Sequence, residues 1–150
     1  MSLEFQRINS FLEQHHVMSL ATTDFVELSV CSLFYSYSKE KNSFVVASDR
    51  STTHIQHILQ NSNISGNILL ETKTVGKVQG VQFQGKMKLL KDSELKALYF
   101  KTFPYALTML PTLWQIEVKY FKMTDNRLGF GKKIELYTSS MLVKNDKSGD

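Results

Sequence analysis

The stretch "SDRSTTHIQHI", Ser48 to Ile58, places hydroxyl side chains, Arg50 and His54 between a run of β-branched residues and a helical pattern. A helix N-terminus offers free N–H groups and positive potential, and hydroxyls with a cation complete an anion site. The same residues also fit a capping box, because Gln56 follows Thr53 at the required spacing. The stretch therefore predicts a helix cap, either alone or as part of a site for an anion such as phosphate.

The four histidines form two pairs. His54 and His57 are one helical turn apart and could share a face, but no other segment supplies metal ligands at a recognisable spacing. We therefore expect two polar residues on a solvated helix face, and no metal site. His15 and His16 end the first predicted helix, where imidazoles suit the negative end of the helix dipole.

A second motif, "GVQFQGKM" from Gly80 to Met87, is close to a P-loop. A P-loop needs a Ser or Thr after its lysine, and a loop between its glycines. Met87 follows Lys86 here, and the intervening residues alternate like a strand. The motif therefore predicts a strand, with Val81, Phe83 and Met87 on one face. No Ser–His–Asp or Cys–His arrangement has recognisable local context either, so any redox chemistry is expected to come from a cofactor.

Composition and charge favour a globular chain with a mild preference for anions. The sequence has 150 residues, of which 42% are hydrophobic and 21% charged, and a net charge of +4. We expect a single domain over residues 1–142 and a polar tail over 143–150. Cys31 is the only cysteine, so we expect no internal disulfide and a buried side chain in a strand. With no apolar leader or membrane-length apolar run, a cytoplasmic location is expected.

The hydrophobic pattern predicts three helices among several strands. Short connections join the first strands, which excludes parallel crossovers and favours an α+β domain built on an antiparallel sheet or barrel. Phe5, Ile8 and Leu12 form the apolar stripe of the first helix. The periodicity predicts helices over 2–16, 53–60 and 93–103, and strands over 17–23, 25–38, 43–48, 63–72, 76–90, 113–124 and 132–138.

Two segments give the chain a family resemblance: "KMTDNRLGFGKK", residues 122–133, and "GVQFQGKM" on the long strand. Across residues 3–138 the chain resembles the pyridoxamine 5′-phosphate oxidase-like FMN-binding split barrels, and within them a small bacterial branch. The resemblance implies an α+β fold with a six-stranded antiparallel split β-barrel and flanking helices. It also implies a homodimer that binds FMN at the subunit interface, and a flavin-dependent oxidoreductase whose substrate the sequence does not identify.

The same resemblance implies three groups of cofactor contacts. They are Ser48, Thr52, Thr53 and His54 for the phosphate; Ser32, Ala47 and Gln82 for the flavin ring; and Phe130 and Lys132 from the C-terminal strands of the partner subunit. The turn that contains the last two residues also has a structural interpretation, because Asp125, Asn126 and Gly129 are turn formers and Gly131 allows a positive φ.

The chain departs from the oxidase at positions that matter for its chemistry. The oxidase has an adjacent Arg–Lys pair where this sequence has Thr53 and His54, and an Arg–Gln pair where it has Gln79 and Gly80. Hydroxyls hold phosphate less strongly than a bidentate arginine. We therefore do not expect oxidation of pyridoxamine 5′-phosphate.

Two other functions stay open. Some similar split barrels bind or degrade haem, and a neutral histidine can be the axial ligand. A non-enzymatic dimeric barrel could instead bind nucleic acid weakly, with a steep salt dependence. The lysines are spread along the chain rather than clustered, which counts against a specific nucleic-acid surface.

Overall fold

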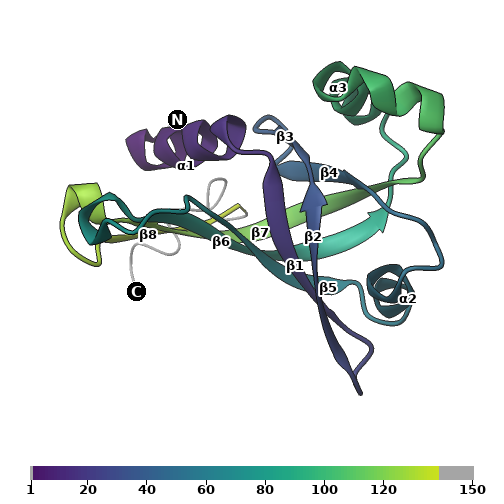
Figure 1. Cartoon of the computed structure of the whole chain (residues 1–150), viewed down its shortest axis with the longest axis horizontal. Helices are drawn as coiled ribbons and strands as arrows, with labels where there is room; N and C mark the ends of the chain where they lie inside the picture. Colours follow the sequence, from purple (N-terminus) through teal and green to yellow (C-terminus); the bar gives the residue numbers. More distant parts are fainter. Residues whose placement is uncertain (1, 139–150) are drawn as a thin grey trace.

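The computed structural model describes residues 2–138 and shows one antiparallel sheet with three α-helices packed on it (Figure 1). The predicted tail, 143–150, lies outside the described residues. The elements are α1 (Leu3–Gln14), β1 (Val17–Thr23), β2 (Leu28–Phe34), β3 (Ser36–Ser38), β4 (Ser43–Ala47), α2 (Thr53–Gln60), β5 (Asn63–Leu69), β6 (Gln79–Leu89), α3 (Ser93–Thr102), β7 (Leu113–Asp125) and β8 (Lys133–Tyr137), with short 3₁₀ turns η1 (Val75–Lys77), η2 (Pro104–Met109) and η3 (Asn126–Leu128).

The strand order makes the sheet curl into a split barrel. Neighbouring strands follow the order β2-β1-β5-β6-β7-β4-β3, and β8 pairs with β7. β2 and β3 lie at opposite ends of this path, yet only Tyr35 separates them in the chain. The two ends must therefore approach each other, and β2 also contacts β4. The predicted α+β fold with an antiparallel split barrel is confirmed.

Among residues 2–138 the sheet has eight strands, where the resemblance implied six and periodicity predicted seven. The eighth arises because the chain changes partners at Tyr35. The single strand predicted over 25–38 was wrong. Its first part, β2, pairs with β1, and its second part, β3, pairs with β4. Tyr35 fixes this corner by donating its hydroxyl to the carbonyl of Leu12 at 2.7 Å, and its N–H to the carbonyl of His16 at 3.0 Å. Periodicity cannot reveal such a change, because it does not indicate which strand each residue pairs with.

Aromatic rings fill the barrel. Phe44 lies among three of them, with ring centroids 4.7 Å from Phe83, 5.0 Å from Tyr35 and 5.1 Å from Tyr37. The predicted stripe of α1, Phe5, Ile8, Phe11 and Leu12, is buried against this core. On β6 the expected inward residues Val81, Phe83 and Met87 are also buried. Helix α1 thus covers one open end of the barrel.

The near-P-loop motif lies on β6, as predicted. Its second glycine, Gly85, is at a β-bulge in the pairing with β7, where a Cβ would collide with the carbonyl oxygen of Glu117. Gly85 therefore lets the backbones of β6 and β7 approach closely, because it has no side chain. Cys31 is half-buried rather than buried, because β2 is an edge strand that exposes part of both faces. Among residues 2–138, no helix has the length and apolar character needed to cross a membrane.

Candidate functional site

The segment from Ser48 to His54 joins β4 to α2 and is held firmly at its start. Ala47 is the last residue of β4 and pairs with Leu113 on β7. The Ser48 N–H donates to the carbonyl of Thr112 at 3.1 Å, and the indole N–H of Trp114 donates to the Ser48 carbonyl at 2.9 Å. Both backbone groups of Ser48 are therefore fixed by residues that lie far away in the sequence.

The predicted capping box is wrong. The N-cap of α2 is Thr52 rather than Thr53, and its hydroxyl donates to the Asp49 carbonyl at 2.8 Å instead of accepting from the helix. The side-chain amide of Gln56 donates to the Arg50 carbonyl at 2.7 Å. The turn before the helix draws both side chains away, so neither caps the first N–H groups of α2. Uncapped N–H groups at a helix start, with the hydroxyls of Ser48 and Thr52 nearby, are the features of an anion site.

The two histidines of α2 are buried, which corrects the expectation of a solvated face. His54 Nε2 lies 2.6 Å from the Ser48 hydroxyl and 3.4 Å from that of Thr52. His57 Nδ1 lies 3.0 Å from the buried hydroxyl of Thr22 on β1. Helix α2 packs against β1, and both imidazoles are buried. His57 contacts a hydroxyl on β1, whereas His54 contacts hydroxyls of the segment that precedes α2. Burial, and secondarily the proximity of His57, lower the pKa of His54, which favours its neutral form.

One cation and one carboxylate flank this segment. The Arg50 guanidinium lies 5.4 Å from the centre of the Trp114 ring. A carboxylate oxygen of Asp49 accepts from the N–H of Ser51 at 2.8 Å and from its hydroxyl at 2.9 Å, and these bonds lower the pKa of Asp49. The charges of Arg50 and Asp49 offset each other in the net charge of the segment. The electrostatic attraction for an anion therefore comes mainly from the backbone N–H groups of α2.

Two of the residues expected to contact the flavin ring, Ser32 and Gln82, lie on the outer face of the sheet. The strand register aligns Ser32, Ser19, Asn67 and Gln82 in one row across β2, β1, β5 and β6. Ser32 and Gln82 are three strand spacings apart, or about 14 Å. The two residues therefore share a face but lie at different ends of the row.

Two adjoining cavities open on this face, with volumes of about 410 and 380 Å³. They share Ala21, Ser65 and Gln84, and Tyr120 lines the second. Sequence reasoning missed these residues and also Trp114. The alternation of side chains along each strand predicts that those on the strands of the outer face point outward. Which of them become neighbours depends on the strand register, and the sequence does not give it.

Phe130 and Lys132 are exposed in the loop between β7 and β8. This loop lies at the far end of the sheet from α2 (Figure 1). As predicted, Gly131 has a positive φ, of 72°, and its N–H donates to the side-chain oxygen of Asn126 at 3.0 Å. Within one chain, then, Ser48, Thr52, Thr53 and His54 lie together beside Ala47. Ser32 and Gln82 occupy the outer face, and the loop residues lie apart from both groups.

Comparison with known proteins gives relatives by sequence and by structure. No protein-family model matches the chain. A UPF0306 protein of Cronobacter sakazakii is 35% identical over 130 residues, covering 85% of this chain and 90% of the relative. A UPF0306 protein of Yersinia pestis is 32% identical over 130 residues, covering 85% of this chain and 88% of the relative.

Solved structures share the fold at low sequence identity. A haem-binding protein from Mycobacterium smegmatis has a TM-score of 0.78 at 12% identity, over 95% of this chain and 61% of that one. An FAD-binding protein from Mesorhizobium loti has a TM-score of 0.67 at 14% identity, over 79% of this chain and 90% of that one. The chain therefore belongs to the UPF0306 family, and its fold is that of split barrels that include flavin-binding and haem-binding proteins.

Proposed function

We propose that this protein binds FMN, with the cofactor phosphate at the segment from Ser48 to His54. One observation carries the proposal: the N-terminus of α2 has no side-chain cap, although the hydroxyls of Ser48 and Thr52 lie beside it. Free helix N–H groups with adjacent hydroxyls suit a phosphate. The similarity of the fold to an FAD-binding protein adds support.

In this proposal the residues of the segment have separate roles. The N–H groups of Thr53 and His54 donate to phosphate oxygens, and Arg50 supplies the positive charge. The Arg50 guanidinium lies over the Trp114 ring, and its N–H groups can bind a phosphate. Ser32 and Ala47 flank the flavin ring where β2 approaches β4. The bound flavin supplies the electron transfer of an oxidoreductase, while the chain binds and orients it.

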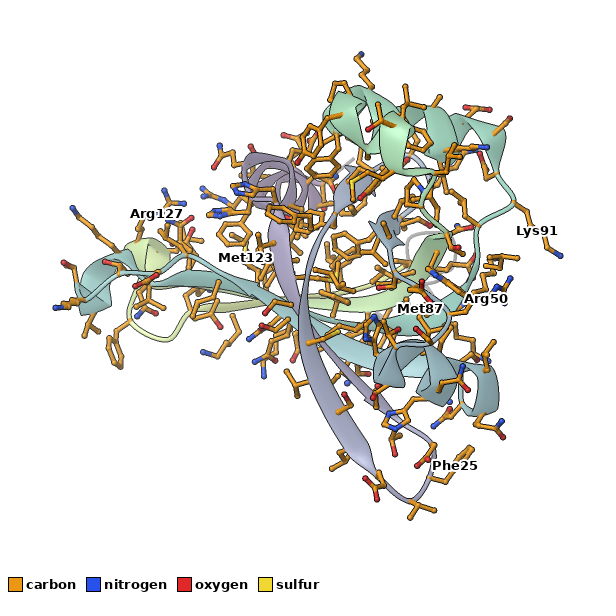
Figure 2. The ribbon with its side chains drawn as sticks, turned by 45° about the vertical axis from the view of Figure 1, so that its right-hand side comes forward. Phe25, Arg50, Met87, Lys91, Met123 and Arg127 are labelled. Atoms are coloured by element: carbon orange, nitrogen blue, oxygen red, sulfur yellow. The ribbon has the colours of Figure 1, made fainter. Side chains whose placement is uncertain are left out.

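The proposal includes a homodimer formed through the outer face of the sheet. On the edge strand β2, Leu28 is 85% exposed and Val30 is 73% exposed. Phe25 projects from the tip of the β1–β2 hairpin (Figure 2). Exposed apolar side chains on an edge strand are typical of a protein–protein interface. A partner subunit would let Gln82, Phe130 and Lys132 reach the second cofactor.

Comparing FMN with riboflavin tests the phosphate site directly, because riboflavin lacks only the phosphate. We expect the protein to quench flavin fluorescence with at least tenfold higher affinity for FMN than for riboflavin. Arg50→Gln should weaken FMN binding about tenfold and leave riboflavin binding unchanged. Lys73→Gln, which removes an exposed charge elsewhere, serves as the control.

Equal affinities for FMN and riboflavin would remove the phosphate from this segment. Failure to bind either flavin, with the protein folded by circular dichroism, would overturn the proposal as a whole. The oligomeric state is measured in parallel by light scattering. A monomer that binds FMN would be consistent with the phosphate site but would contradict the proposed homodimer interface.

Haem is the second candidate, favoured by the position of His16. This residue is exposed and its ring is stacked on Phe34, with centroids 5.9 Å apart. The ring nitrogens of His54 and His57 already contact hydroxyls. A haem-binding structure also shares the fold. If haem binds, a Soret band should persist after gel filtration and be lost in His16→Ala but kept in His57→Gln.

A further inference from the structure

A separate cavity lies between α1 and the end of the sheet that carries η3. Its volume is about 450 Å³, and its polar lining includes Arg7, Ser10, Gln14, Gln79 and Arg127. In the described part of the chain, no acidic side chain lines it. Figure 2 shows Arg127 and Met123 on the side of the sheet that α1 covers, and Arg50 at the opposite end of the molecule. The cavity is therefore distinct from the proposed phosphate site.

A buried carboxylate orients Arg127. The side chain of Asp125 is 1% exposed, and its two oxygens accept from Arg127 Nε at 3.0 Å and from Nη2 at 2.7 Å. One of these oxygens also accepts the Arg127 backbone N–H at 3.0 Å. Of the five guanidinium N–H donors, Asp125 takes two, and within residues 2–138 the remaining three are left to bind a ligand. The side chain of Arg127 is 54% exposed, so these donors remain accessible.

Hydrogen bonds from Asn126 hold this arginine's loop in place. The Asn126 N–H donates to the carbonyl of Val78 at 3.0 Å, and its side-chain amide donates to the carbonyl of Val75 at 2.8 Å. Both partners belong to the segment around η1 that leads into β6. The position of Arg127 is thus fixed by the fold as well as by Asp125, which is the preorganisation that a binding site needs.

A second guanidinium comes from α1. Arg7 is half-buried, and among residues 2–138 no carboxylate forms an ion pair with it. It is close enough to Asp125 to contribute to the lowered pKa of that carboxyl, although Arg127 is the main cause. Two guanidiniums against one buried carboxylate leave the cavity with a net positive charge. Such a charge favours an anion.

His15 also lines the cavity. Its apolar walls are Phe11, Leu70 and the buried Met123. We propose that it binds a small organic anion, with a carboxylate or phosphate held between Arg7 and Arg127 and an apolar body against these three residues. The volume lies in the range of ordinary small-molecule sites. Guanidiniums bind both oxyanions through paired N–H groups.

The test uses probes that differ only in the charged group. Benzoate and phenyl phosphate present the two oxyanions on one ring, and benzamide is the neutral counterpart of benzoate. Each is titrated into the ¹⁵N-labelled full chain, and amide shifts are followed by NMR. We expect saturable shifts at Ser10, Gln79 and Arg127 with one or both anions, and at least tenfold weaker binding of benzamide.

Variants separate binding from folding. Arg7→Gln leaves the Asp125–Arg127 pair intact and should weaken anion binding about tenfold. Arg127→Lys keeps a positive charge beside Asp125 but loses the planar fork, with a similar expected loss. Lys77→Gln removes an exposed charge on η1 and should change nothing. Equal binding of benzoate and benzamide, unchanged affinity in Arg7→Gln, or shifts confined to Ser48–His54 would each overturn the proposal.

Discussion

Two turns at opposite ends of the molecule contain the same pair of residue types, an aspartate followed closely by an arginine (Figure 2). In the turn before α2, Asp49 is exposed and bonds to Ser51, while Arg50 lies over Trp114. In the turn after β7, Asp125 is buried and holds Arg127 through both oxygens. Both carboxylates accept a backbone N–H of their own turn, but only the buried one, Asp125, also holds the guanidinium.

The difference extends to how each turn would attract an anion. The turn before α2 offers backbone N–H groups and hydroxyls, because its cap residue bonds to Asp49 instead of to the helix. The turn after β7 offers guanidinium N–H groups, because Asp125 occupies only part of the Arg127 donor set. The first depends on local chain geometry. The second depends on a long-range contact between the sheet end and α1.

Replacing each aspartate by alanine should give the largest contrast in stability. Asp125→Ala removes the buried partner of Arg127 and leaves the backbone N–H of that residue without its acceptor. We expect a loss of about 3 kcal/mol in the free energy of unfolding. Asp49→Ala, at an exposed site, should cost less than about 1 kcal/mol. Urea denaturation measures both.

Equal losses of unfolding free energy in the two variants would show that burial of the carboxylate does not make the Asp125 turn more important for stability than the Asp49 turn. A loss below about 1 kcal/mol for Asp125→Ala would likewise contradict the assignment of Asp125 as a buried anchor. Arg127→Lys sharpens the comparison, because it keeps the charge while losing the paired hydrogen bonds. That variant should fall between the wild type and Asp125→Ala.

A smaller effect is expected from the hydroxyl that holds His54. Ser48→Ala leaves the buried His54 Nε2 with only the distant Thr52 hydroxyl, at 3.4 Å. Loss of this partner should cost about 1–2 kcal/mol. Ser51→Ala is the matched control, since its hydroxyl bonds to an exposed carboxylate, and should cost less than about 0.5 kcal/mol. A Ser48→Ala variant as stable as Ser51→Ala would mean that water replaces the lost hydroxyl at His54.

The sequence predicted well the features that follow from hydrophobic periodicity. The stripe of α1, the bounds of α2 and the inward side chains of β6 all follow from periodicity and are confirmed. The positive φ of Gly131 follows from its residue type. Local patterns leave open whether the strands form an open sheet or a barrel. The prediction of a barrel came from the family resemblance.

One error is local: the capping box fails because Thr52 and Gln56 donate to the carbonyls of Asp49 and Arg50. The other errors come from contacts between distant segments. The strand over 25–38 breaks at Tyr35 because its halves pair with β1 and β4. His54 and His57 are buried because α2 packs on β1, where Thr22 accepts or donates to His57. The pair of Arg7 and Arg127 combines residues 120 positions apart in the sequence, and spacing gives no sign of it.

The smallest effect concerns pH and separates the two turns once more. The pKa of His54 is lowered in the folded chain, mainly by burial, so the unfolded chain binds more protons as pH falls through about 6.5. Stability contributed by the neutral imidazole is present above that pH and is lost on acidification, by at most about 1.4 kcal/mol per pH unit. The pKa of Asp125 is also lowered, so its contribution is lost only at much lower pH, as its carboxyl protonates. Unfolding in urea between pH 7.5 and 5.5 should therefore report on histidines rather than on Asp125.

Two variants test this dependence of the free energy of unfolding on pH. The lowered pKa of His15 gives a slope of the same sign, so His54→Gln should reduce the slope without abolishing it, and His15→Gln should remove the remainder. An unchanged slope in His54→Gln would contradict a neutral, buried His54 and would leave the turn before α2 open to protonation.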